Sequence, residues 1–143
     1  MLADDINLHD IFRIQPTAML LLTADLAIVD ANEAFLAAVG RKLEDMIGHN
    51  IFEEFPKQPE HPGEPQWTAL EEAMTSGRRQ IDKLSRYDIE DPAHPGWLEE
   101  HWATTVAQPI RGSDGHVQMI ELSTRDVTPI IGQYRAMQRE DET

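Results

Sequence analysis

The alternation of apolar and polar residues in the second half of the chain predicts three long strands. From Gln80 onward, apolar positions recur with a period of two, which is typical of strands that bury one face. The predicted strands cover residues 80–89, 97–110 and 116–127. Two apolar runs near the N-terminus, at 19–23 and 27–29, have the pattern of a tight hairpin, so we expect five strands in all.

Capping signals place short helices between the hairpin and these strands. Asp30 lies three residues before Glu33, and Thr68 lies three residues before Glu71, so each pair has the form of a capping box that opens a helix. A glycine follows each of the two segments and would end its helix. A further short helix is expected over residues 43–47.

Helices are also expected at the two ends of the chain. Residues 1–15 carry apolar side chains at roughly helical spacing and end before Pro16, which predicts an amphipathic lead helix. Thr128 has the position of an N-cap, and Pro129 has that of the first helical turn, where a missing N–H costs nothing. Residues 129–143 would therefore form the start of a C-terminal exit helix.

Together these elements predict an α+β fold: a five-stranded antiparallel sheet with short helices across one face, within residues 16–128. The last strand has apolar residues on both faces, Ile120 with Leu122 and Val117 with Met119. In a sheet whose outer face is exposed to solvent, apolar and polar residues would alternate more regularly along the strand. We therefore expect the lead helix or a second subunit to cover the outer face.

Composition and charge limit the functions that are open to the chain. Its 143 residues, 41% of them hydrophobic, have the size and composition of one globular domain. The 26 acidic and 12 basic residues give a net charge of −14, which argues against binding to nucleic acid or to an anionic membrane surface. The chain has no cysteine, which excludes disulfides, thiolate metal sites and cysteine nucleophiles. An acidic N-terminus and the lack of an apolar run of roughly 18 residues predict a cytoplasmic protein.

Six motifs along the chain resemble those of the PAS domain, the sensory module of bacterial histidine kinases and related signalling proteins. They are DLAIVDANEAF at 25–35, IGHNIF at 47–52, Arg86-Tyr87-Asp88-Ile89, Glu100-His101-Trp102, Asp114-Gly115 and Asp126-Val127-Thr128. The resemblance covers residues 9–128. His101 departs from it, because a bulkier aromatic residue is more usual there, and this bears on what the pocket accepts.

The resemblance implies a non-catalytic module that belongs to or regulates a kinase. It holds a small ligand between helices and sheet and passes a change to its last helix, with Asp126 and Thr128 as relay candidates. Tyr87 and Trp102 would offer a hydroxyl and an indole N–H to a ligand, or would simply pack in the core. Arg86 would form a surface ion pair or bind a carboxylate ligand. The candidates for the ligand pocket are Phe35, Phe52, Leu70, Met74, Tyr87, Trp102 and Ile120.

The resemblance also sets tests for cofactors. The flavin-adduct light sensors of the family need a thiol beside the flavin, and this chain has none. The oxygen-sensing haem subgroup needs a histidine on the helix at 68–76, which also has none, so haem could bind only through His49 or His61. The other histidines lack metal-ligand spacing on any one helix. We therefore expect no metal, haem or flavin, and a small-molecule ligand whose identity stays open.

Apolar residues at both ends predict a homodimer. Ile130, Tyr134 and Met137 follow one another at spacings of four and three, as in a seam between helices, and Ile11 and Phe12 are candidates from the lead helix. The output would go to an effector domain or a partner signalling protein. Two alternatives are a ligand-free dimerisation or protein-interaction domain and a small cone-shaped α+β enzyme with one buried carboxylate.

Overall fold

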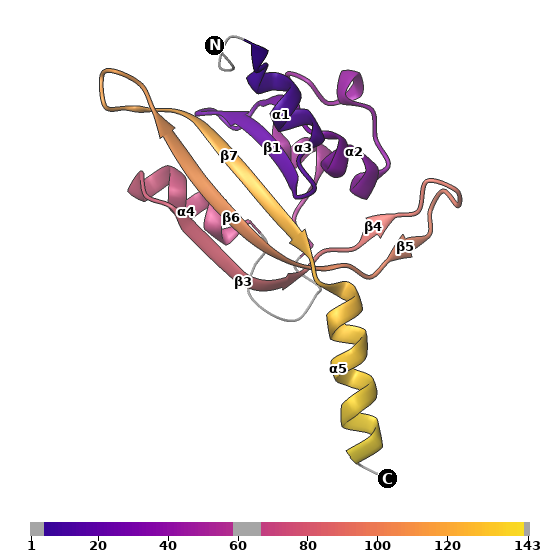
Figure 1. The fold of residues 1–143 in the computed structure, drawn as a ribbon. Coiled ribbons are helices and arrows are strands. Elements are labelled where there is room, and N and C mark those ends of the chain that lie inside the picture. Colours follow the sequence, from indigo (N-terminus) through magenta and orange to yellow (C-terminus); the bar gives the residue numbers. More distant parts are fainter. Residues whose placement is uncertain (1–4, 59–66, 142–143) are drawn as a thin grey trace.

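The computed structural model describes residues 5–58 and 67–141 of the chain. Its centre is a five-stranded antiparallel sheet with the strand order β2-β1-β7-β6-β3 (Figure 1). The strands are β1 (Ala18–Thr23), β2 (Ile28–Ala31), β3 (Gln80–Arg86), β6 (Trp102–Arg111) and β7 (Val117–Asp126). The predicted α+β fold with its five-stranded sheet is confirmed.

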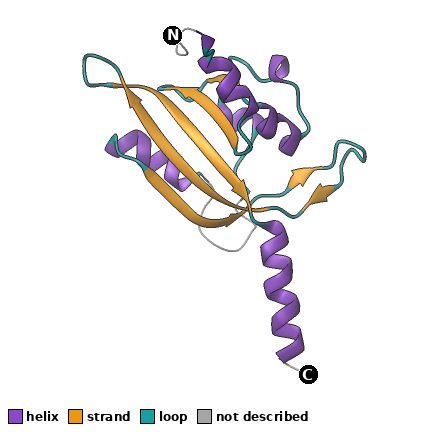
Figure 2. Cartoon of the chain, in the orientation of Figure 1, coloured by secondary structure: helices purple, strands orange, loops and turns teal. Residues whose placement is uncertain are grey.

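Short helices lie beside the sheet, and the last helix extends away from it (Figure 2). The helices are α1 (Leu8–Ile14), α2 (Glu33–Val39), α3 (Ile51–Glu54), α4 (Thr68–Ser76) and α5 (Thr128–Asp141). The helix expected over residues 43–47 is a 3₁₀ turn at Leu43–Asp45. The lead helix is shorter than residues 1–15, and residues 1–4 lie outside the described part, as does His61.

The core lies between the central strands and the helices. Leu20 and Leu22 of β1 pair with Leu122 and Ile120 of β7, and all four side chains are fully or almost fully buried. Ala107 of β6 lies opposite Leu122 on the same face. Because the side chains alternate along each strand, these inward positions give the sheet one apolar face for the helices to cover.

The predicted strands 80–89 and 97–110 are each interrupted. Residues Ile89–Glu90 and Leu98–Glu99 form a separate two-stranded arm, β4 and β5, that projects from the sheet (Figure 1). At the break, the Gln58 side chain donates to the Asp88 carbonyl at 2.9 Å and accepts from the Asp88 N–H at 2.8 Å. The backbone groups of Asp88 are thus used by a side chain instead of a neighbouring strand, so the strand prediction is wrong there.

The predicted N-caps at Asp30, Thr68 and Thr128 are wrong. β2 continues to Ala31, so Asn32 becomes the cap of α2, and its Oδ1 accepts from the Phe35 N–H at 3.0 Å. Helix α4 begins after Trp67, and the Ala69 N–H donates to Asp82 Oδ1 of β3 at 3.0 Å. The Thr128 hydroxyl accepts from the Trp102 N–H at 2.9 Å, outside its own helix.

The outer face of the sheet is not covered by the lead helix over its whole width. α1 contacts the end of β2, where His9 Nε2 lies 3.1 Å from Asp30 Oδ2, and the start of α2, where Arg13 forms an ion pair with Glu33. On the outer face Ile81 and Ile110 remain exposed. A second subunit over this face stays a prediction.

Candidate functional site

A cavity of about 130 Å³ lies between α2 and the sheet. Ser85 of β3, Ala103 and Thr105 of β6 and Thr124 of β7 form its floor, because they share the inward face of neighbouring strands. Phe35, from α2, and Phe55, from the residue after α3, line its helical side. The cavity therefore lies where the helices meet the sheet, and it is partly open to solvent.

Several of the residues that line the cavity are aromatic. Phe35 meets Phe55 edge-to-face with ring centroids 5.8 Å apart, and Phe55 lies 6.4 Å from Trp67. Trp67 in turn meets Tyr87 edge-to-face at 5.9 Å. Trp102 lines the cavity from the start of β6. Edge-to-face contacts of this kind fix the rings relative to one another, so the wall is preorganised.

The structure brings three of the seven predicted pocket residues to this cavity: Phe35, Tyr87 and Trp102. The other four do not line it. Leu70 and Ile120 are fully buried in the core, Met74 packs against that core, and Phe52 contacts Trp67 from the far side of the aromatic row, with centroids 6.3 Å apart.

The two polar groups expected to face a ligand already donate hydrogen bonds within the protein. The Tyr87 hydroxyl donates to the Pro56 carbonyl at 2.6 Å, and Trp102 Nε1 donates to Glu100 Oε1 at 2.5 Å. By contrast, the indole Nε1 of Trp67 is buried and has no hydrogen-bond partner among the described residues. Sequence reasoning missed Trp67, although a single tryptophan just before a predicted helix start is a usable signal.

The charged residues that line the cavity are acidic, together with one histidine. Asp82 and Asp126 line it with His101, and no lysine or arginine of the described segments does. Arg86 instead forms a bidentate pair with Asp88, with N–O distances of 2.9 and 3.1 Å. The hydrogen bond to Asp88 raises the pKa of the half-buried Arg86 guanidinium. Arg86 thus has the ion pair expected of it and does not line the cavity.

The relay candidates lie at the junction of β6, β7 and α5. Asp126 Oδ1 accepts from the Thr128 N–H at 2.8 Å, and Asp126 Oδ2 lies 3.2 Å from His101 Nδ1. Burial works to raise the pKa of Asp126, but the hydrogen bonds from Thr128 and His101 leave that pKa below its ordinary value. Since Asp126 and His101 also line the cavity, the junction begins at the cavity wall.

A second connection leads from the cavity to α5, and sequence reasoning missed it. Glu100 accepts from Trp102 Nε1 and, at 2.9 Å, from Arg135 Nη1 of α5. The Arg135 guanidinium also lies over the Trp102 ring, 5.6 Å from its centroid. The hydrogen bonds from Trp102 and Arg135 hold the pKa of Glu100 below its usual range. We call these three residues the exit clamp.

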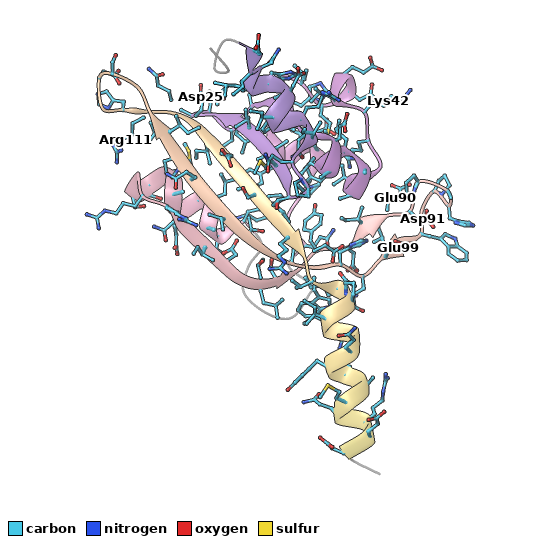
Figure 3. All side chains as sticks on the ribbon, viewed as in Figure 1. Asp25, Lys42, Glu90, Asp91, Glu99 and Arg111 are labelled. Atoms are coloured by element: carbon cyan, nitrogen blue, oxygen red, sulfur yellow. The ribbon has the colours of Figure 1, made fainter. Side chains whose placement is uncertain are left out.

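A larger, more polar hollow of about 420 Å³ adjoins the cavity beside the β4–β5 arm. The two share Val39, Phe55, Tyr87 and Ile89. The arm carries Glu90, Asp91 and Glu99 (Figure 3). It also carries Trp97 and Leu98, which are 70% and 63% exposed. The inner cavity, which is smaller and more apolar, is the better place for a ligand, because desolvation there strengthens each contact.

Over residues 5–58 and 67–141, no group of three histidine or acidic side chains is arranged to hold a metal ion. His49, the candidate haem ligand, does not line the cavity; its Nδ1 lies 2.5 Å from Glu54 Oε1. That hydrogen bond raises the pKa of the exposed His49. His61 lies outside the described residues.

Comparisons with solved structures show the same fold elsewhere. An RNA-binding light-oxygen-voltage receptor has a TM-score of 0.71 and 19% identity, over 95% of this chain and 36% of the receptor. The light-oxygen-voltage protein of Rhodobacter sphaeroides has a TM-score of 0.64 and 17% identity, over 85% of this chain and 65% of that protein. This chain thus spans less than two thirds of either protein. A sensory box histidine kinase of Vibrio cholerae has a TM-score of 0.54 and 22% identity, over 90% of this chain and 94% of the kinase structure.

The sheet, the helices over one face and the cavity between them define the class of α+β domain to which the chain belongs. A family model described as the PAS fold matches residues 12–129, and the chain belongs to this family. Its fold is that of a PAS domain, which differs from the cone-shaped α+β fold considered as an alternative. No curated protein sequence matches the chain. None of the described helices is long and apolar enough to cross a membrane.

Proposed function

We propose that this domain senses a small molecule in the inner cavity and reports it through α5. The observation that carries the proposal is the position of Trp102, which lines the cavity and also takes part in the exit clamp with Glu100 and Arg135. An occupant that shifts the Trp102 ring changes the contacts of Arg135 on the ring and on Glu100. The populations of α5 orientations shift accordingly.

The ligand is smaller than a flavin or a haem. An engineered protein cavity of about 150 Å³ holds a single benzene ring, and the inner cavity is about 130 Å³. A three-ring flavin or a haem is larger than this volume, so the proposed ligand is a smaller molecule. The missing thiol is a second argument against light-driven flavin chemistry in this chain. Some solved structures of similar fold are nevertheless light-oxygen-voltage proteins.

The domain itself performs no catalysis in this proposal, and α5 leads to a histidine kinase or a comparable cytoplasmic effector. The similarity to the Vibrio cholerae kinase supports the choice of effector class at the level of fold. RNA is not a proposed partner, although one similar receptor binds it, because a net charge of −14 repels a phosphate backbone. A homodimer through α5 belongs to the same proposal.

The competing function is a ligand-free domain for pairing subunits. Mass spectrometry of the gently purified chain separates the two, because a sensor carries a bound small molecule and a pairing domain does not. A second experiment measures the position of α5 relative to the sheet. Since the chain has no cysteine, Gln108→Cys on the sheet and Ala136→Cys on α5 accept spin labels at only these two sites.

We expect the distance distribution between these labels to shift when the cavity is filled, in samples diluted with unlabelled chain. Trp102→Phe keeps a ring in the wall but removes the donor to Glu100, so the shift should be lost in this variant. Trp97→Phe, in the exposed arm, is the control and should respond like the wild type. A filled cavity with an unchanged distribution would refute the proposed output.

A further inference from the structure

Two threonines form a polar strip on the floor of the inner cavity. Thr105 of β6 and Thr124 of β7 lie directly opposite each other in the sheet. Asp82 of β3 pairs with Thr105 on one side, and Ala18 of β1 pairs with Thr124 on the other. All four residues line the cavity. The strip therefore crosses four neighbouring strands on the inward face of the sheet.

The next inward row of the sheet shows how the filled core differs from the strip. Two residues further along their strands, Leu20, Leu122 and Ala107 pair across β1, β7 and β6, and all three are fully or almost fully buried. In the strip, the same two strand positions of β1 and β7 carry an alanine and a threonine instead of two leucines. The cavity thus lies where the inward side chains are shorter and carry hydroxyl groups.

The hydroxyl groups of Thr105 and Thr124 are within reach of a ligand. Neither hydroxyl has a hydrogen bond to another described residue, although facing threonines can bond to each other. Among the described residues, Trp67 Nε1 is the only polar side-chain atom that is both buried and unpaired, so the two threonine oxygens keep accessible surface. Because both side chains point to the inward face and line the cavity, that surface borders the cavity.

The charge around the strip favours an uncharged ligand. Asp82 and Asp126 line the cavity, and no lysine or arginine of the described segments does, so an anion would meet two carboxylates without a balancing cation. A cation would compete with hydrogen bonds that the two carboxylates already accept. Asp82 accepts from the Ala69 N–H, and Asp126 accepts from the Thr128 N–H. Hydroxyl groups, by contrast, bind neutral donors and neutral acceptors alike.

The size and the apolar wall define the body of the ligand. About 130 Å³ suits one six-membered ring with a small substituent. Phe35, Phe55, Tyr87 and Trp102 line the cavity, and aromatic side chains pack favourably against another ring. A flexible aliphatic chain of the same volume would lose more rotational freedom on binding.

We propose that the inner cavity binds an uncharged single-ring compound whose hydroxyl or carbonyl oxygen forms hydrogen bonds with the hydroxyl groups of Thr105 and Thr124. This proposal rests on the proposed sensing function and adds the chemical class of the ligand. A ligand hydroxyl donates to one threonine and accepts from the other, and a ligand carbonyl accepts from both. The two threonines then set specificity, while the aromatic side chains supply apolar contact.

Four simple compounds serve as probes of the full ¹⁵N-labelled chain. Phenol and toluene have nearly the same shape and differ by a hydroxyl in place of a methyl group, whereas benzoate and benzylammonium carry opposite charges. Titrations followed by the backbone amide signals of β6 and β7 give the dissociation constants. We expect phenol to bind more tightly than benzoate and more tightly than benzylammonium.

The decisive quantity is the ratio of the dissociation constants of phenol and toluene. The double variant Thr105→Val, Thr124→Val replaces both hydroxyls by methyl groups, so it should weaken phenol binding about tenfold and leave toluene binding unchanged or tighter. Each single variant keeps one hydroxyl and should give about a threefold change, which still tests the proposal if the double variant fails to fold. Thr104→Val is the matched control. Thr104 pairs with Arg125 on the outer face of β6 and does not line the cavity, so the ratio should stay the same.

An unchanged ratio in the threonine variants would overturn the role of the strip and would indicate that water alone satisfies its hydroxyls. Tighter binding of benzoate or of benzylammonium than of phenol would overturn the uncharged class. In both cases the cavity still binds a ligand, so the sensing function survives.

No binding of any of the four probes would also overturn the proposed class. The sensing function would then be judged separately, by whether mass spectrometry finds another bound molecule. A bare chain in that measurement would refute the sensing function itself.

Discussion

Asn32 is the most deeply buried polar residue among the described ones, and its side chain joins α2 to β1 and to the residue before β1. Its Oδ1 accepts from the N–H groups of Met19 on β1 and Phe35 on α2, at 2.9 and 3.0 Å. Its Nδ2 donates to the Thr17 carbonyl at 2.8 Å. Each bond satisfies a backbone group that water does not reach easily, so the residue holds α2, and with it Phe35, against the sheet.

We predict that Asn32→Ala lowers the free energy of unfolding by about 3 kcal/mol, because it leaves several partly buried backbone groups unpaired. The melting temperature should fall by roughly 10 °C in a thermal melt followed by circular dichroism. Asn7→Ala is the matched control. Asn7 caps α1 in the same way, accepting from two N–H groups, but it is exposed, so its loss should cost about 1 kcal/mol or less. Equal losses in the two variants would contradict the role of burial.

At the scale of single residues, the sequence predicts the apolar part of the cavity better than its polar part. The apolar side of a predicted helix leads to Phe35, and the motifs of the family resemblance lead to Tyr87 and Trp102. Whether a hydroxyl or an indole N–H is free depends instead on the partner that folding brings to it. Pro56 lies 31 residues from Tyr87, so no local pattern shows that bond. Trp67 lies outside the periodic segments and was missed for this reason.

The exit clamp is the feature by which one element, α5, is held relative to the sheet. We predict that Glu100→Gln broadens the distance distribution between spin labels at positions 108 and 136, because Arg135 loses its ionic partner. The effect on global stability should be small, within about 1 kcal/mol, since the pair is at the surface. Glu99→Gln is the control. Glu99 is the neighbouring carboxylate and does not contact Arg135, so its removal should leave the distribution unchanged.

The clamp should also depend on pH in a defined direction. The pKa of Glu100 is lowered in the folded chain, so its contribution is present above the unfolded value and is lost as the pH falls through the lower folded value. Wild type and Glu100→Gln should therefore differ at neutral pH and converge in acid, once the pH is below the lowered pKa of the folded chain. A difference between them that persists at low pH would show that the charge of Glu100 is not what matters.

At the scale of elements, the order and type of the helices and strands follow from the sequence, but their ends do not. The caps illustrate the reason. The residue types at the predicted caps, Asp30, Thr68 and Thr128, are all favourable for capping. However, the strand pairing of β2 continues to Ala31, and at the start of α4 Asp82 of β3 accepts the hydrogen bond of the Ala69 N–H. The Thr128 hydroxyl is drawn to the Trp102 N–H. Partners distant in sequence thus decide between equivalent local choices, and the same holds for the strand break at Asp88.

At the scale of the whole molecule, α5 is the part that most needs a partner. It has 14 residues, near the length at which an isolated helix is marginal in water, and it extends away from the sheet. Ile130, Tyr134 and Met137 are 54%, 58% and 63% exposed along one side of it. On the lead helix Ile11 is exposed and Phe12 is half-buried. These surfaces support the proposed homodimer, in which α5 pairs with its copy.

We predict that the full chain is a dimer in light scattering at high concentration and that removal of residues 129–143 makes it a monomer. Because each chain carries a net charge of −14, repulsion between copies should weaken the dimer at low ionic strength and salt should strengthen it. Met137→Asp places a charge in the apolar side of α5 and should dissociate the dimer. Ala136→Asp adds the same charge, but the 100° turn per residue carries it well away from that side, so it should have little effect. A chain that stays monomeric at every salt concentration, or that loses its dimer equally in both variants, would show that α5 does not pair through this surface.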